Sequence, residues 1–288
     1  MTGRGSRSVT VLETGPLTTL QDEGRLGQGA IGVGRSGACD RASYRLANRL
    51  VGNPPGAAAL EVTLGGLTLR ADTALWVVST GARCGGSPHN APMMLSAGAE
   101  LRLAPPAAGL RTYVAVRGGF DVPPVLGSLS TDILSGLGPS VLQAGDQIPV
   151  GDARGEHPHV DVAPVREPED GQLTVRVTPG PRHDWFPEDS WRTFVTQTYT
   201  VSNDSNRVGL RLEGEALSRE TDRELPSEGM VRGAVQIPAS GTPVLFLADH
   251  PVTGGYPVIA YVVDEDVDRC AQLRPGQTVR FIPDPARS

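Results

Sequence analysis

The sequence predicts a mainly β fold, arranged as two similar barrels in tandem with few short helices. The 36 glycines and 25 prolines are spread over the 288 residues and separate short segments rich in Val, Leu, Ile and Thr. Such segments, bounded by turn residues, are typical of strands. Few segments show helical spacing of apolar residues. Three blocks of the first half also recur in order in the second half, which indicates an internal duplication.

The predicted strands lie in segments that alternate apolar and polar residues. They are SVTVLETG (8–15), LTLRADTALWVVST (67–80), AELRLAP (99–105), TYVAVRGG (112–119), LTVRVTPG (173–180), AVQIPASGTPVLFLAD (234–249), PVIAYVV (257–263) and TVRFIPD (278–284). We expect closed or near-closed sheets, because closure removes unpaired strand edges.

Two segments predict helices. Asp40 can cap a helix that runs to Val51, because Leu46, Ala47 and Leu50 recur at helical spacing and Gly52 ends the pattern. A second, shorter helix is predicted in PEDSWRTFVTQ, which begins at Pro187.

The recurring blocks set the predicted domains. VTVLETGP (9–16) corresponds to LTVRVTPGP (173–181), residues 60–81 correspond to 230–250, and AGAELRLAP (97–105) corresponds to PGQTVRFIP (275–283). The stretch between the halves is charged, rich in proline and poor in large apolar residues, which is typical of a linker. The sequence therefore predicts a first barrel over 1–150, a linker over 151–171 and a second barrel over 172–288.

Composition excludes several classes of function. The net charge is −6, and Arg and acidic residues are interspersed, so there is no nucleic-acid footprint. No apolar run is long enough for a membrane span, and the first residues lack the apolar core of a signal peptide. Three scattered cysteines predict neither a disulfide framework nor a zinc cluster, so a reducing, cytoplasmic setting is expected.

All 26 basic residues are arginine, because the chain contains no lysine. This excludes a lysine Schiff base, a P-loop lysine, a Ser-Lys catalytic pair and a biotin-carrying lysine in this polypeptide. The sequence also lacks the G-x-S-x-G, H-E-x-x-H and C-x-x-C motifs. Any chemistry must therefore use Arg, Asp, Asn, His and backbone groups, with help from another polypeptide.

The loop QDEGRLGQGAIGVG (21–34) contains a formal match to the glycine pattern of dinucleotide sites. A true site needs a strand before the glycines and a helix at the last of them, and neither is predicted here. Two interpretations remain: a wide turn in which glycine permits positive φ, or an anion-binding nest flanked by Arg25 and Arg35.

Three further motifs combine polar side chains with glycine turns. In RGGFDVPPVLGSLSTD (117–132), hydroxyls, a carboxylate and a guanidinium suit a small polar substrate, or else form a hairpin with a capped turn. In ADHPVTGGY (248–256), His250 stands at a predicted strand end beside glycines, where sites are frequent. In SNDSNRVG (202–209), Asn206 and Arg207 can clamp a carboxylate or amide, or form an Asx turn. His157 and His159 are expected to be solvated, and His89 and His183 lie in turns without an obvious partner.

Five segments together resemble one family. TTLQDEGRLGQGAIGVGRSGACD (18–40), NPPGAAALE (53–61), VRGGFDVPPVLGSLSTD (116–132), SNRVGLRLEG (205–214) and HPVTGGYP (250–257) are similar to the family called biotin-dependent carboxyltransferase or allophanate hydrolase subunit 2. That family includes the C component of the prokaryotic 5-oxoprolinase and resembles the carboxyltransferase region of urea carboxylase. The similarity covers nearly the whole chain and is weakest at 151–171.

The resemblance implies two tandem cyclophilin-like β-barrels and work in a hetero-oligomeric complex. The implied partners are a subunit 1 homologue, which is the B component in oxoprolinases, and a third, lactam-utilisation protein, the A component. The implied reaction is ATP-dependent opening of 5-oxoproline to glutamate. One alternative is transfer of a carboxyl group from carboxybiotin, carried by another chain, to urea or a similar amide. A second alternative is a regulatory binding protein without catalysis. Direct amidase activity of the Ser-Ser-Lys type is excluded, because the chain has no lysine.

The candidate site residues come from these motifs, and both proposed reactions need groups that stabilise an anionic oxygen next to nitrogen. The predicted catalytic residues are Asp22, Arg117, Asp132, Asp249 and His250. The predicted substrate-binding residues are Arg25, Arg35, Asp40, Ser128, Thr131, Asn206, Arg207, Thr253, Gly254, Gly255 and Tyr256.

Overall fold

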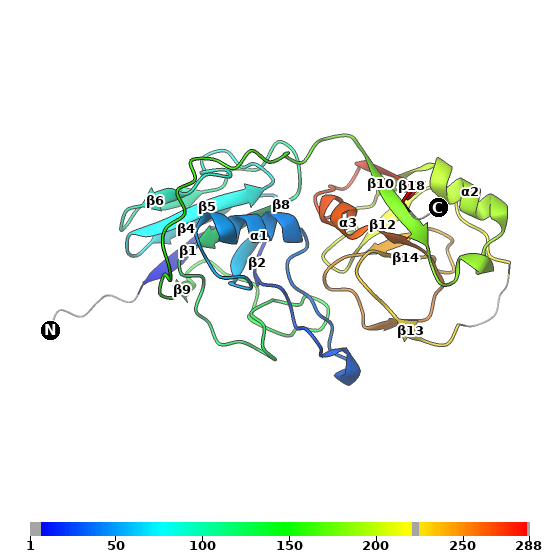
Figure 1. Ribbon diagram of the computed structural model, residues 1–288, viewed down its shortest axis with the longest axis horizontal. Coiled ribbons are helices and arrows are strands. Elements are labelled where there is room, and N and C mark those ends of the chain that lie inside the picture. The colour runs from blue at the N-terminus through cyan, green and yellow to red at the C-terminus, as the bar shows by residue number, and fades with distance from the viewer. Residues whose placement is uncertain (1–6, 221–224, 287–288) are drawn as a thin grey trace. The chain divides into compact units, whose positions relative to one another are not determined.

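The computed structural model describes residues 7–220 and 225–286, and it is mainly β (Figure 1). Three α-helices of ten residues or fewer accompany the strands in this part of the chain. The predicted fold class, mainly β with few short helices, is confirmed. The chain divides into two compact units, and two pieces of the first half group with the second unit: Leu26–Cys39 and Ile133–Ser135.

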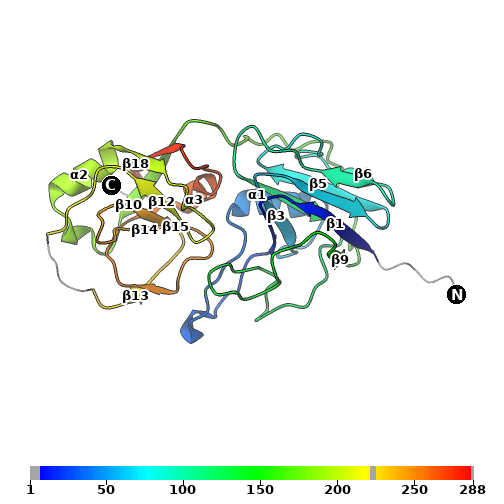
Figure 2. The same cartoon turned by 180° about the vertical axis from the view of Figure 1, so that it is seen from behind.

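The strands of the first unit form two sheets. One sheet has the order β7-β4-β1-β9, from Glu100–Arg102, Leu67–Ala71, Ser8–Thr14 and Gln147–Pro149. The other has the order β2-β3-β8-β5-β6, from Leu17–Gln21, Ala59–Thr63, Arg111–Val116, Leu75–Gly81 and Met93–Leu95. Both sheets contribute to one apolar core, in which Val11, Leu60 and Val114 are completely buried. Figure 2 shows β1 and β9, which pair antiparallel, from behind.

Helix α1 (Arg41–Leu50) packs against β5 and β8 of the five-stranded sheet (Figure 1). Its bounds agree with the predicted helix. The Asp40 side chain caps it by accepting a hydrogen bond from the Ser43 N–H at 2.9 Å, which satisfies a backbone donor that the first turn leaves unpaired. Gly52, with φ +67°, follows the helix.

The second unit contains a closed barrel in the order β10-β17-β14-β15-β12-β11-β18. Its strands are Gln172–Pro179, Val258–Val262, Ala234–Gln236, Val244–Phe246, Gly209–Glu213, Thr198–Val201 and Thr278–Pro283. The parallel pairing of β10 with β18 belongs to this ring, and Val175 and Phe281 are partners in it. A short two-stranded sheet joins β13 (Glu228–Gly229) to β16 (Thr253–Gly254).

Helices α2 (Glu188–Thr196) and α3 (Asp264–Cys270) flank this barrel, with the 3-10 turn η2 at His183–Trp185. Helix α2 confirms the short helix predicted after Pro187. Phe194 of α2 stacks on Phe281 of β18, with ring centroids 4.6 Å apart. Helix α3 was not predicted, because its seven residues are mostly charged and Val263 offers no side-chain cap. The acidic residues of its first turn were the available signal.

The segment Leu26–Cys39 contains the 3-10 turn η1 (Gly29–Ile31), and most of the residues around this turn are exposed. Leu26 and Ile31 are 64% and 67% exposed, and a Cβ added at Gly27, Gly29 or Gly32 would meet nothing within 4 Å. No α-helix opens at Gly32, where φ is +78°. The interpretation of this loop as a dinucleotide turn is therefore excluded by its structure as well as by its sequence.

The predicted linker contains no helix or strand, and its residues up to Glu169 group with the first unit. Ala163 donates its N–H to the Asn90 carbonyl at 2.8 Å. The expectation that His157 is solvated is wrong: its ring lies 4.1 Å from the Trp76 ring and is half-buried. Packing against a large aromatic surface removes the apolar part of the imidazole from water.

Candidate functional site

Asp22 is the centre of a buried hydrogen-bond network in the first unit. Its carboxylate accepts hydrogen bonds from the hydroxyls of Ser128 (2.7 Å) and Ser130 (2.5 Å). It also accepts from the N–H groups of Leu129 (2.6 Å) and Gly24 (2.7 Å). Three of these donors reach Oδ1 and one, the Leu129 N–H, reaches Oδ2. Asp22 therefore organises the loop 128–132 through both of its oxygens.

Arg25 lies in the same network but makes only one of its possible hydrogen bonds within it. Its Nη2 donates to the Ser130 carbonyl at 2.5 Å, and the side chain is about 2% exposed. Its Nε and Nη1 atoms are buried and have no acceptor in the part of the chain that the structure describes. A buried cation with unpaired donors is costly, so this group is the least satisfied of the candidate arginines.

Thr131 and Asp132 continue the loop that Asp22 organises. The Thr131 hydroxyl donates to the Pro139 carbonyl at 2.9 Å, and the Asp132 N–H donates to the Leu137 carbonyl at 2.9 Å. Gly138 packs against the same loop: a Cβ there would lie 2.0 Å from the Ser130 carbonyl oxygen and 2.5 Å from Arg25 Nη2. Loops 22–25, 128–132 and 136–139 are therefore built around one another.

Arg117 and Asp40 have contacts that explain them structurally. The Arg117 guanidinium donates to the carbonyls of Val51 (2.9 Å) and Gly155 (2.7 Å). It thereby ties the end of α1 to the segment that follows the first unit's last strand. Asp40 caps α1, and its N–H donates to the Tyr113 hydroxyl at 2.7 Å. The predicted functional roles of both residues stay predictions.

Arg207 and Asp249 form a buried ion pair in the second unit. Arg207 Nε lies 2.9 Å from Asp249 Oδ2, and Nη2 lies 3.0 Å from Oδ1. The Ser36 hydroxyl donates to Asp249 Oδ1 at 2.6 Å, and the Ile133 N–H donates to Oδ2 at 3.0 Å. Arg207 also donates to the Gly37 carbonyl at 2.7 Å. The pair thus binds both segments of the first half that group with this unit: Ser36 and Gly37 belong to Leu26–Cys39, and Ile133 belongs to Ile133–Ser135. Arg35, which is half-buried, lies in the first of these segments.

His250 is half-buried and follows the ion pair in the chain. Its Nδ1 lies 2.8 Å from the Pro251 carbonyl oxygen. Because a carbonyl can only accept, Nδ1 carries the proton in this contact, and the basic lone pair of the neutral ring is then on Nε2. This tautomer suits a residue that takes a proton from a substrate or water.

The remaining predicted residues of this unit are more open. Asn206 is exposed and accepts from the Val208 N–H at 2.7 Å, which is an Asx turn. Thr253 and Gly254 form β16, Gly255 follows them, and the Tyr256 side chain is 46% exposed. A Cβ at Gly254 would lie 2.7 Å from Gln236 Nε2, so a side chain there would require the Gln236 side chain to shift.

Two residues of these networks, Ser130 and Ser36, and one arginine outside them, Arg232, were missing from the predicted set. For the two serines, the only sequence signal was their position: Ser130 lies in the hydroxyl-rich motif 117–132, and Ser36 directly follows Arg35. Arg232 donates to the Cys39 carbonyl at 2.8 Å and pairs with Asp264 at 2.7 Å and Asp268 at 2.5 Å. No local sequence pattern marks Arg232, because its partners lie in the segment Leu26–Cys39 and in α3.

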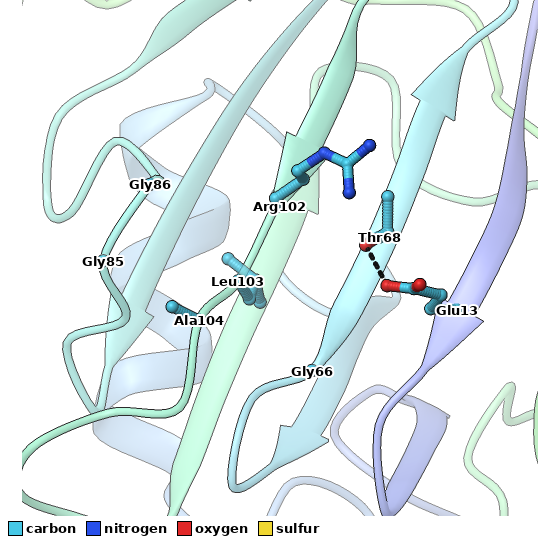
Figure 3. Close-up of a pocket in the computed structure, with 8 residues that line it drawn as sticks. All are labelled: Glu13, Gly66, Thr68, Gly85, Gly86, Arg102, Leu103 and Ala104. Carbon is cyan, nitrogen blue, oxygen red and sulfur yellow. Dashed lines mark hydrogen bonds between the residues drawn. The ribbon is translucent and has the colours of Figure 1, made fainter.

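An open pocket of about 320 Å³ lies on the four-stranded sheet of the first unit (Figure 3). Glu13, Thr68 and Arg102 line it with Leu103, Ala104 and three glycines. The Thr68 hydroxyl donates to Glu13 at 2.8 Å, and Arg102 pairs with Glu100 outside the lining set. None of the predicted site residues lines this pocket.

Residues 7–220 and 225–286 contain neither a candidate metal cluster nor a helix suited to a membrane. No group of three or more His, Cys, Asp or Glu residues there is arranged to hold a metal ion. None of the helices in those ranges has the length and apolar character needed to cross a membrane.

Comparisons with known proteins give a consistent result. Residues 31–283 match the family described as carboxyltransferase domain, subdomain A and B. The chain is 40% identical to the C component of the 5-oxoprolinase of Escherichia coli, over 94% of this chain and 90% of that protein. The solved structure of TTHA0988 superposes with a TM-score of 0.86 at 33% identity, and urea carboxylase of Kluyveromyces lactis with 0.88 at 29%. Each alignment covers 98% of this chain, but the chain spans only 56% and 28% of those longer proteins.

Proposed function

We propose that this chain, which belongs to the family of the carboxyltransferase domain, subdomain A and B, is the C component of a 5-oxoprolinase-like complex. The observation that carries the proposal is the match to the C component of a 5-oxoprolinase, which extends over nearly the full length of both proteins. The match to urea carboxylase covers only a part of that larger protein. The proposed reaction is ATP-dependent opening of the lactam ring of 5-oxoproline to give glutamate.

The chain is proposed to act only with partners: a homologue of the B component and a third protein, the A component. This fits its chemistry, because it lacks both a lysine and the recognisable nucleophile motifs. ATP is a co-substrate of the complex, and its phosphates would have to meet arginines, backbone N–H groups or a partner's residues here. A cytoplasmic complex is consistent with the three buried cysteines, Cys39, Cys84 and Cys270, which form no disulfide.

Among the predicted catalytic residues, contacts favour His250 as the group that moves a proton. Its ring tautomer leaves Nε2 as the basic nitrogen, as described above. Asp22 and Asp249 accept hydrogen bonds from several protein donors, so their proposed part is to hold loops in place. Arg117 is proposed to act in the same way, through the carbonyls that it binds.

A second candidate is a carboxyltransferase component that moves a carboxyl group from carboxybiotin to urea or a related amide. The family model and the TM-score of 0.88 with urea carboxylase favour it. The biotin would have to arrive on another chain, because this one has no lysine to carry it.

The deciding experiment is to purify the chain with its B-component homologue, add the A component and measure ATP hydrolysis that depends on 5-oxoproline. Turnover that requires all three components supports the first function. Absence of that turnover, together with carboxylation of urea by the pair when a carboxybiotin-loaded carrier is supplied, would establish the second function instead.

A further inference from the structure

Three buried arginines among the predicted site residues, two in the first unit and one in the second, differ in what their guanidinium groups bind. Arg207 is neutralised by Asp249, and Arg117 donates to two backbone carbonyls. Arg25 donates to one carbonyl, that of Ser130, through Nη2. Its Nε and Nη1 atoms reach no acceptor among residues 7–220 and 225–286, although the side chain is almost fully buried.

The nearby carboxylate does not pair with this cation. Asp22 accepts from Ser128, Leu129, Ser130 and Gly24, and these neutral donors use both of its oxygens. Ser130 lies between the two charged groups: its hydroxyl binds Asp22 and its carbonyl accepts from Arg25. Donors on the guanidinium therefore remain for an additional acceptor, and an anionic acceptor gives the strongest hydrogen bonds.

The loop around Gly138 closes directly on the guanidinium. At φ +96° a side chain is strained, and a Cβ would come within 2.5 Å of Arg25 Nη2. Only glycine lets the backbone approach this closely. Ser130 and Gly138, which lie against the guanidinium, both belong to loops, and loops can move to admit a ligand more readily than strands can.

We propose that Arg25 binds the carboxylate of the lactam substrate, an inference that rests on the proposed 5-oxoprolinase function. Arg25 and Asp22 together carry no net charge, so one incoming carboxylate leaves the site with a single negative charge. The polyphosphate of ATP would bring several negative charges next to Asp22, which disfavours it as the ligand. A planar carboxylate also matches the geometry of guanidinium N–H groups. The ring opening does not change this carboxylate. Arg25 is therefore a substrate-binding residue that takes no part in breaking the amide bond.

The test uses the assembled complex with wild-type chain, Arg25→Gln, Arg25→Lys and the control Arg45→Gln. Arg45 is a matched control because it makes a two-pronged pair with Glu23, beside Asp22 in sequence, and is about half exposed. Calorimetry gives the dissociation constants of 5-oxoproline and of its neutral amide, which differ only in the carboxylate. Steady-state kinetics give KM for 5-oxoproline and for ATP.

We expect Arg25→Gln to weaken 5-oxoproline binding roughly 10- to 100-fold, the range for losing a charged hydrogen bond. Binding of the neutral amide and KM for ATP should change little, so the preference for acid over amide disappears. Arg25→Lys should keep part of that preference, and Arg45→Gln should keep all of it. If Arg25→Gln does not assemble, the ratio of the dissociation constants of the amide and of the acid, measured on Arg25→Lys, decides.

Two results would overturn the inference. One is an unchanged preference for acid over amide in both Arg25 variants, and the other is a rise in KM for ATP alone. Failure of the wild-type complex to turn over 5-oxoproline would instead refute the proposed function, so the two failures are distinguishable.

Discussion

Arg207 and Asp249 form a two-pronged ion pair inside the second unit, each about 1% exposed. Ser36 and Ile133, which precede Arg207 by many residues, donate to the same carboxylate. The pair therefore has its charges matched and its oxygens bonded. A buried pair of this kind can contribute little net stability while being costly to break from one side.

The first prediction follows from this difference between the small net stability of the ion pair and the large cost of removing one partner. Arg207→Ala should lower the free energy of unfolding by roughly 3–5 kcal/mol, because it leaves the Asp249 charge buried and unpaired. Adding Asp249→Leu to it should recover part of the loss. Denaturant unfolding measures both. Arg45→Ala is the control, because its exposed pair with Glu23 should be worth only about 0–1 kcal/mol. Equal losses for Arg207→Ala and Arg45→Ala would contradict the prediction.

The second prediction compares two glycines with nearly the same backbone. Gly138 has φ +96° and Gly145 has φ +98°, but an added Cβ at Gly145 meets nothing within 4 Å. At Gly138 it would lie 2.0 Å from the Ser130 carbonyl oxygen. Gly145→Ala should cost about 1–3 kcal/mol from strain alone. Gly138→Ala should cost at least ~1 kcal/mol more, since overpacking adds to the strain. Equal melting temperatures for the two variants would contradict the prediction, because the 136–139 loop would then shift to admit the Cβ at no cost.

The third prediction concerns pH. Burial lowers the pKa of His89 from 6.5; Glu167, whose Oε1 lies 3.9 Å from Nε2, acts in the opposite direction, and Arg83 lowers it further. The unfolded chain therefore binds a proton at this residue before the folded chain does. The stabilising contribution is present above about pH 6.5 and is lost as the pH falls below it. His89→Leu should flatten the fall in unfolding free energy between pH 7 and 5. Exposed His159→Gln serves as the control, and the same slope in wild type and His89→Leu would refute the assignment.

The fourth prediction separates the two nitrogens of His250. Asn in place of His250 can keep a donor to the Pro251 carbonyl, the contact that Nδ1 makes at 2.8 Å, but it has no group at the place of Nε2. The turnover number of the complex should fall about 10²- to 10⁴-fold, the usual contribution of a general acid or base. The melting temperature should stay near that of wild type. Full turnover by His250→Asn would remove this residue from the chemistry.

Several elements were predictable because their causes are local. Helix α1 was predicted from Asp40, which caps it, and from Gly52, which follows it. The strands β1 and β10 were predicted from alternating Val and Thr residues between turn residues. Helix α3 was missed because a seven-residue segment that begins Asp-Glu-Asp has no apolar periodicity, and packing of Val267 and Cys270 into the barrel core stabilises it.

The candidate site was predictable only as a set of residue types. The motifs around Asp22, Ser128 and Arg207 could be recognised as polar clusters. Their roles depend on bonds between residues that are far apart in the chain, such as Asp22 with Ser130 and Ser36 with Asp249. No local pattern encodes such pairs.

The sequence by itself determined the mainly β fold class and the exclusion of lysine chemistry, because these follow from residue types and their spacing, and five of its motifs resemble the family that the comparisons show. Only the tertiary structure decided which charged groups are already neutralised. Burial removes the solvent that would otherwise satisfy every charged group, so each one must find partners in the fold or keep donors unpaired. Arg207 has its carboxylate in Asp249, whereas Arg25 keeps buried donors, and this difference singles out Arg25 as the residue to test.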